Sequence, residues 1–122
     1  MKRDMDLVRK ILLSIENDPS GYVPDEISIE GYTQEEIGYH VLIMIDAGLL
    51  SGEDTSYIGG RSPSGTATRM TWQGHEFLDS CREETRWDRA KRIGVRVGGL
   101  TFEMMKRILL HLMEDQVRAV LG

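Results

Sequence analysis

The sequence contains a single cysteine, Cys81, among its 122 residues. A lone cysteine excludes an intrachain disulfide and suits a reducing compartment. The longest apolar run, Val41 to Ile45, is interrupted by Asp46. It is far shorter than the roughly 18 residues that a membrane span requires. Acidic residues near the amino terminus interrupt the apolar stretch that a signal peptide needs. We therefore expect a cytoplasmic protein that does not cross a membrane.

Motifs for catalysis and cofactor binding are also missing. The stretch GHEFLD at residues 74–79 lacks the second histidine of a zinc-binding helix, because Asp79 stands in its place. The run Gly59-Gly60-Arg61 lacks the lysine and the following helix of a phosphate-binding loop. We expect no enzymatic activity, no metal, no cofactor and no small-molecule ligand. We interpret Gly74 as a joint that lets a strand and the following helix pack closely.

Charge is distributed unevenly around a net value of −5. Residues 1–60 contain 4 basic and 12 acidic residues, whereas residues 61–122 contain 11 and 8. Any basic surface must therefore come from the second half, where basic side chains gather at Arg82, Arg86, Arg89, Lys91, Arg92 and Arg96. Glu83, Glu84 and Asp88 lie among them, so a solvated helix with internal ion pairs is the simpler interpretation of this cluster.

The first half predicts two helices and two strands. Apolar residues recur at helical spacing over residues 4–17, before turn-forming residues that include Pro19. Residues 24–30 alternate like a half-buried strand. Thr33 and Glu36 form a capping-box pattern that predicts a helix from Thr33 to Ala47, with Gly48 as its stop. A further strand begins at Leu49.

The second half predicts the other side of a hairpin and two long helices. A polar, glycine-rich segment precedes a β-prone run over residues 66–71, which is typical of a hairpin with a long tip. A helix capped by Thr71 is expected to continue through Trp87 toward Ile93. Its inward face would comprise Phe77, Leu78, Cys81 and Thr85.

The last helix, predicted from Thr101 to about Val120, is apolar on more than one side. We hypothesise that it pairs with the same helix of a second copy in a homodimer; the alternative is that it wraps its own domain on two sides. The candidate dimerisation residues are Phe102, Met105, Leu109, Leu112, Met113 and Val117. The expected domains are residues 1–98 and a C-terminal helix at residues 99–122.

The order of these elements resembles a winged helix, which implies an α+β, mostly helical domain with a two-stranded wing. YHVLIMIDAGLLSGED resembles the end of a winged-helix third helix, and MTWQGHEFL resembles the segment that leaves the second wing strand. Together with TRWDRAK, these stretches are similar to an uncharacterised family of bacterial and prophage proteins, the DUF2513-like proteins, over residues 1–95. A helix-turn-helix segment that opens like TQEEI next needs a turn and a separate recognition helix. Only Gly38 and Tyr39 separate TQEEI from His40 here, so the helix-turn-helix is shortened. The resemblance implies a fold and no activity.

Two functions remain open. The first is a DNA-binding regulator of phage or mobile-element origin, which contacts double-stranded DNA through wing and basic helix. Its candidate contacts are Tyr57, Arg61, Arg69, Arg82, Arg86, Arg89, Lys91 and Arg92. The alternative is a non-enzymatic module that binds a protein partner through the acidic first half. The helix at residues 33–47 has no lysine or arginine, which disfavours it as a groove-reading element.

Overall fold

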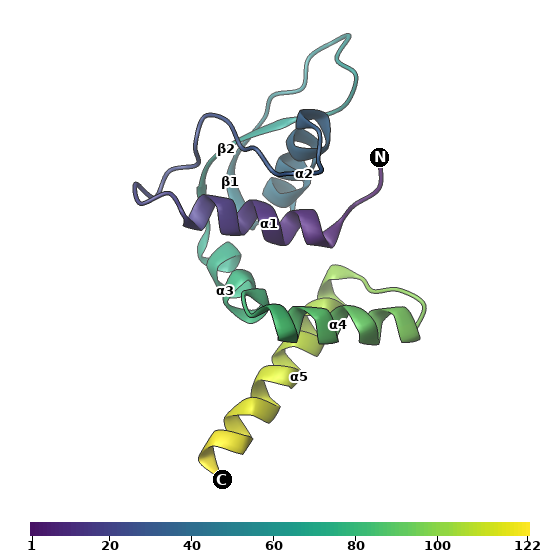
Figure 1. Ribbon diagram of the computed structural model, residues 1–122. Helices are drawn as coiled ribbons and strands as arrows, with labels where there is room; N and C mark the ends of the chain where they lie inside the picture. Colours follow the sequence, from purple (N-terminus) through teal and green to yellow (C-terminus); the bar gives the residue numbers. More distant parts are fainter. The chain divides into compact units, whose positions relative to one another are not determined.

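The computed structural model describes residues 1–122, which form five α-helices and a two-stranded antiparallel sheet (Figure 1). The predicted α+β, mostly helical class is confirmed. The chain divides into two compact units, Met1–Leu78 (unit 1) and Asp79–Gly122 (unit 2). The division lies ahead of the boundary expected at residue 98, because helix α4 packs against helix α5 within unit 2.

Unit 1 begins with helix α1, Met5–Glu16. Asp4 caps it, since its side chain accepts hydrogen bonds from the backbone N–H groups of Asp6 and Leu7. The apolar stripe predicted from the sequence faces the core through Leu7, Val8, Ile11, Leu12 and Ile15. Its burial is the main hydrophobic contribution of α1 to unit 1.

The strand predicted over residues 24–30 is wrong, because this segment is irregular. Val23, just before this segment, makes one backbone hydrogen bond to the sheet, from its N–H to the Thr68 carbonyl at 2.8 Å. Pro24 then has no N–H to continue a ladder. The alternation read from the sequence reflects instead the insertion of Ile27, which is buried, into the core.

Helix α2, Gln34–Asp46, starts at the predicted capping box. The Thr33 hydroxyl accepts from Glu36 N at 3.1 Å, and Thr33 N donates to the Glu36 carboxylate at 2.9 Å. The helix ends before Gly48, whose φ of 79° is the left-handed conformation that stops helices. Both ends of this helix were therefore readable from local chemistry.

The wing strands are β1, Leu50–Asp54, and β2, Gly65–Met70, paired antiparallel with a bulge at Ser51/Gly52. Helix α2 packs against both strands, and α1 packs against α2 (Figure 1). The arrangement is consistent with a winged-helix-like domain in which one helix, α2, leads directly into the hairpin. The shortened helix-turn-helix inferred from the sequence matches this order, because no separate recognition helix stands between α2 and β1.

The long helix expected from Thr71 to Ile93 is two helices, α3, Trp72–Cys81, and α4, Glu84–Arg96. The backbone of Glu83 is extended, with φ −72° and ψ 120°, so the helical hydrogen bonding cannot continue through it. Arg86 Nη1 donates to the Ser80 carbonyl at 3.2 Å, which satisfies a group near the end of α3. As a result Thr85, expected to face inward, is exposed.

Unit 2 is built on α4 and α5, Phe102–Leu121. Gly98 and Gly99, with φ of 85° and 125°, make the turn between them. The helix predicted to begin at Thr101 begins at Phe102, and Thr101 is its cap, since the Thr101 hydroxyl accepts from Met104 N at 3.2 Å. None of the five helices combines the length and the apolarity that crossing a membrane would need.

Candidate binding surfaces

The wing tip, residues 55–64, projects from unit 1 (Figure 1). Its base is closed by Ser56 and Ser64: the Ser56 hydroxyl donates to the Ser64 carbonyl at 3.2 Å and accepts from Ser64 N at 2.9 Å. Hydrogen bonds from Ser56 also hold the pKa of Asp54 below its usual value. Beyond this clamp Tyr57 is 76% exposed. The wing thus presents an aromatic ring on an ordered base.

The two arginines predicted for wing contacts differ in their surroundings. Arg61 Nε lies 3.4 Å from the Glu35 carboxylate at the start of α2. This pair is exposed, so it is a weak one. Arg69 is exposed on β2, and its guanidinium makes only a long contact of 3.5 Å with the Met70 carbonyl. Of the two arginines in this hairpin, Arg69 is therefore the one whose charge is not paired with a carboxylate.

Helix α2 has no cation of its own. Glu35 and Asp46 are exposed, and Glu36 is held in the capping box. Unit 1 as a whole contains 6 basic and 13 acidic residues, a net charge of −7. A phosphate backbone would be repelled from α2, which agrees with the interpretation of its sequence.

Helix α4 is divided into an apolar face and a cationic face. Trp87, Ala90 and Gly94 are buried on one side. The other side exposes Arg89, Arg92 and Arg96, a set that we name the arginine row. Spacings of three and seven residues keep these side chains within about 60° of one another around the helix, along about 10 Å of its axis. No acidic side chain forms an ion pair with them.

The remaining cations of the predicted cluster are engaged inside unit 2. Arg82 pairs with Asp79 at 2.8 Å, and Lys91 lies 3.8 Å from Asp88. The side chain of Arg86 is only 14% exposed. Besides the Ser80 carbonyl, it bonds the Gln116 side chain at 2.5 Å, while its Nε is buried without a hydrogen-bond partner. Arg86 therefore ties α5 to the start of α4 and leaves little surface for a ligand.

The six candidate dimerisation residues lie at different depths. Met105, Leu109 and Leu112 are buried, Phe102 and Met113 are half-buried, and Val117 is 55% exposed. Two apolar side chains outside this set also remain on the surface of α5: Leu110 is 56% exposed and Leu121 80%. The C-terminal half of α5 extends past α4 (Figure 1).

The stretch at residues 74–79 is a joint, as predicted. A Cβ on Gly74 would lie 2.2 Å from the Leu49 carbonyl oxygen and 2.6 Å from the Met70 side chain. Thr71 completes the contact, since its hydroxyl accepts from Gly74 N at 3.0 Å and donates to the Gly48 carbonyl at 2.5 Å. His75 is exposed, and no group of three or more His, Cys, Asp or Glu side chains is arranged to hold a metal ion.

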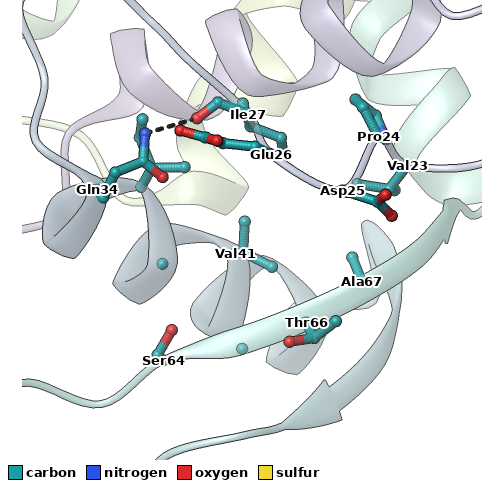
Figure 2. Close-up of a pocket in the computed structure, with 13 residues that line it drawn as sticks. Val23, Pro24, Asp25, Glu26, Ile27, Gln34, Val41, Ser64, Thr66 and Ala67 are labelled. Carbon is teal, nitrogen blue, oxygen red and sulfur yellow. Dashed lines mark hydrogen bonds between the residues drawn. The ribbon is translucent and has the colours of Figure 1, made fainter. Parts of the chain in front are cut away.

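Unit 1 also contains a cavity that the sequence did not reveal. It measures about 330 Å³ and lies between residues 23–27, α2 and β2 (Figure 2). Ile27, Ile37 and Val41 supply apolar lining. Polar lining comes from Asp25, Glu26, Gln34, Ser64 and Thr66. These residues are far apart in the sequence and follow no common periodicity, so only the tertiary structure brings them together.

Comparison with known proteins places the chain in a family. A family model described as a hypothetical protein, DUF2513, matches residues 2–101. An uncharacterised protein of Haemophilus influenzae is 37% identical over 94 residues, which cover 75% of this chain and 76% of that protein. No solved structure matches the chain. The chain therefore belongs to the DUF2513 family.

Proposed function

We propose that this protein is a non-enzymatic, cytoplasmic DNA-binding protein that contacts the phosphates of double-stranded DNA through the arginine row of α4. The observation that supports this is the common face of Arg89, Arg92 and Arg96, which is exposed and free of acidic partners. Guanidinium groups bind phosphate oxygens in a bidentate manner. The wing residues Tyr57 and Arg69 are a separate, weaker contact offered by unit 1.

Such binding reads the DNA backbone and not its sequence, because phosphate contacts position a protein without specifying bases. Helix α2 provides no cation to enter the major groove. The protein would accordingly bind many duplexes with similar affinity. A role in regulation, including that of a mobile element, would then require a second source of specificity.

The test is fluorescence anisotropy with a labelled duplex of about 20 base pairs, titrated at several salt concentrations. Three neutralised phosphates give a slope of log affinity against log salt of about −2.7. Arg92→Ala should reduce that slope by about 0.9. Arg118→Ala, which removes the same charge from α5 outside the row, is the matched control and should have a smaller effect. Salt-independent binding, or equal effects of the two substitutions, would contradict the proposal.

We further propose a homodimer formed by α5, with apolar residues that remain partly or fully exposed on it as the contact. Leu110, Met113, Val117 and Leu121 follow one another at spacings of three and four residues, so they form one stripe (the α5 stripe) of the kind that pairs helices. A dimer would present two arginine rows to one duplex and strengthen weak phosphate binding by avidity.

A second candidate function, a protein-interaction module, is favoured by unit 1. Its net charge of −7 and its cation-free α2 suit a basic protein partner better than a nucleic acid. Alanine substitutions in the arginine row would leave this function intact. Partner binding that survives loss of all three arginines would support this candidate.

A further inference from the structure

The outer edge of β2 has unpaired backbone groups over part of its length. The Ser64 carbonyl accepts from Thr55 N at 3.0 Å, and Thr66 is the partner of Glu53 in the ladder. Successive peptide groups of a strand point in opposite directions. The N–H and C=O groups of Gly65 and Ala67 therefore point away from β1, toward the cavity of unit 1.

Neither residue finds a partner on that side. Val23 covers the edge further along, where its N–H bonds the Thr68 carbonyl, and the chain then diverges from β2 through Pro24. The cavity occupies the space between the diverging segment and residues 64–67 (Figure 2). An unpaired edge of this kind is a template for an added strand.

The cavity is shaped to accept side chains of such a strand. Val41 of α2 lines the cavity (Figure 2). Gly38, also on α2, has no side chain, which lets the Ser64 hydroxyl approach the helix. Ser64 Oγ makes no hydrogen bond, so it is available to a ligand. Gln34 is held at the rim by its bond of 3.0 Å to the Ile27 carbonyl.

The charge at this rim is negative. Asp25 and Glu26 are exposed, and no ion pair forms with either. Both lie in a unit with a net charge of −7. A strand that carries a positive side chain beside these carboxylates would be favoured over an acidic one.

We propose that unit 1 binds an extended, cationic peptide segment of a partner protein, which adds to the outer edge of β2 at Gly65 and Ala67. Its arginine or lysine lies beside Asp25 or Glu26, whose carboxylates point to opposite ends of the cavity (Figure 2). Backbone hydrogen bonds to Gly65 and Ala67 supply the affinity, and the cavity and the two carboxylates supply the selectivity. The site uses none of the residues of the arginine row. The peptide site can therefore be tested independently of the proposed DNA contact.

The test uses the full chain and two defined probes: a blocked peptide of alternating valine and threonine with one central arginine, and the same peptide with a central glutamate. Two-dimensional ¹⁵N–¹H spectra should show shifts centred on the Gly65 and Ala67 amides with the arginine peptide. The exchange of those two amides with solvent should slow. The arginine peptide should bind about two- to tenfold more tightly than the glutamate peptide, as expected for one or two exposed charge contacts.

Two variants make the result specific. Asp25→Asn combined with Glu26→Gln changes only exposed side chains and should abolish the difference between the peptides. Ala67→Pro removes an outward N–H that β1 does not use, so it should abolish binding of both peptides without breaking the ladder. Equal affinities of the two peptides for the unsubstituted chain, or shifts that avoid Gly65 and Ala67, would overturn the proposal. Shifts at these amides caused by duplex DNA and not by peptide would overturn it as well.

Discussion

The Nε2 atom of His40 accepts a hydrogen bond of 2.9 Å from the backbone N–H of Asp4, 36 residues away. The other ring nitrogen, Nδ1, lies 2.8 Å from the Glu36 carbonyl, to which it can only donate. Neutral imidazole with its proton on Nδ1 satisfies both contacts. His40 is 1% exposed and joins the cap of α1 to α2.

Replacement of this histidine should destabilise unit 1. His40→Ala leaves the Asp4 N–H without its partner and opens space in the core, so we expect a loss on the order of 2–4 kcal/mol in the free energy of unfolding. Urea denaturation measures it. The exposed His75, replaced by alanine, is the matched control and should change stability by less than about 0.5 kcal/mol. Similar losses for both variants would refute the structural role of His40.

The Tyr32 hydroxyl donates to the Asp4 carboxylate at 2.9 Å. Partial burial and this hydrogen bond raise the pKa of Tyr32 to about 12. Because the pKa in the folded state lies above the unfolded value of about 10, the contribution of Tyr32 to stability is complete below pH 10 and is lost as pH rises through 12. Ultraviolet titration should show one phenol that ionises near pH 12, and Tyr32→Phe should remove that step.

The same substitution should lower stability below pH 10 by about 0.5–1.5 kcal/mol, the usual net value of one hydrogen bond. The difference between Tyr32→Phe and the parent protein should shrink toward pH 12. Tyr57→Phe, at an exposed tyrosine of the wing, should retain the step near pH 12. A pH-independent difference would argue against the bond to Asp4.

Gly74 is required by the closeness of the Leu49 carbonyl. We expect Gly74→Ala to cost on the order of 1–3 kcal/mol, because the added methyl meets backbone that cannot move aside without disturbing the hairpin. Thermal unfolding followed by circular dichroism provides the measurement. Gln73→Ala, one residue earlier on the same helix, is exposed and should be neutral or slightly stabilising. A stable Gly74→Ala variant would show that the strand and the helix are not held this closely.

The α5 stripe predicts association that depends on concentration. Sedimentation velocity of the full chain should show a dimer at micromolar concentration, because exposed apolar side chains at these spacings bury against an identical helix. Val117→Glu places a charge in the contact and should return the protein to a monomer. Ala119→Glu, which places the same charge on the opposite side of the exposed half of α5, is a control that should preserve the dimer. A parent protein that is monomeric at all concentrations would exclude this interface.

The sequence alone determined the features that local chemistry controls. The capping box at Thr33, the stop at Gly48, the cap at Thr101 and the joint at Gly74 all follow from what these residues do over a few positions of chain. The apolar period of α1 was equally clear. His40 shares the spacing of the buried residues Ile37, Val41 and Met44, so that period was the available signal for its burial.

Only the tertiary structure decided which of the charged and extended segments form surfaces. The six basic residues at 82–96 look alike in the sequence, yet packing of α4 engages Arg86 internally and leaves the arginine row outside. Residues 24–30 alternate like a strand, yet Pro24 and the core position of Ile27 keep them off β2 and open a cavity beside its edge. These outcomes depend on contacts between residues that are distant in the chain. The periodicity of a sequence reflects only residues a few positions apart, so it does not predict such contacts.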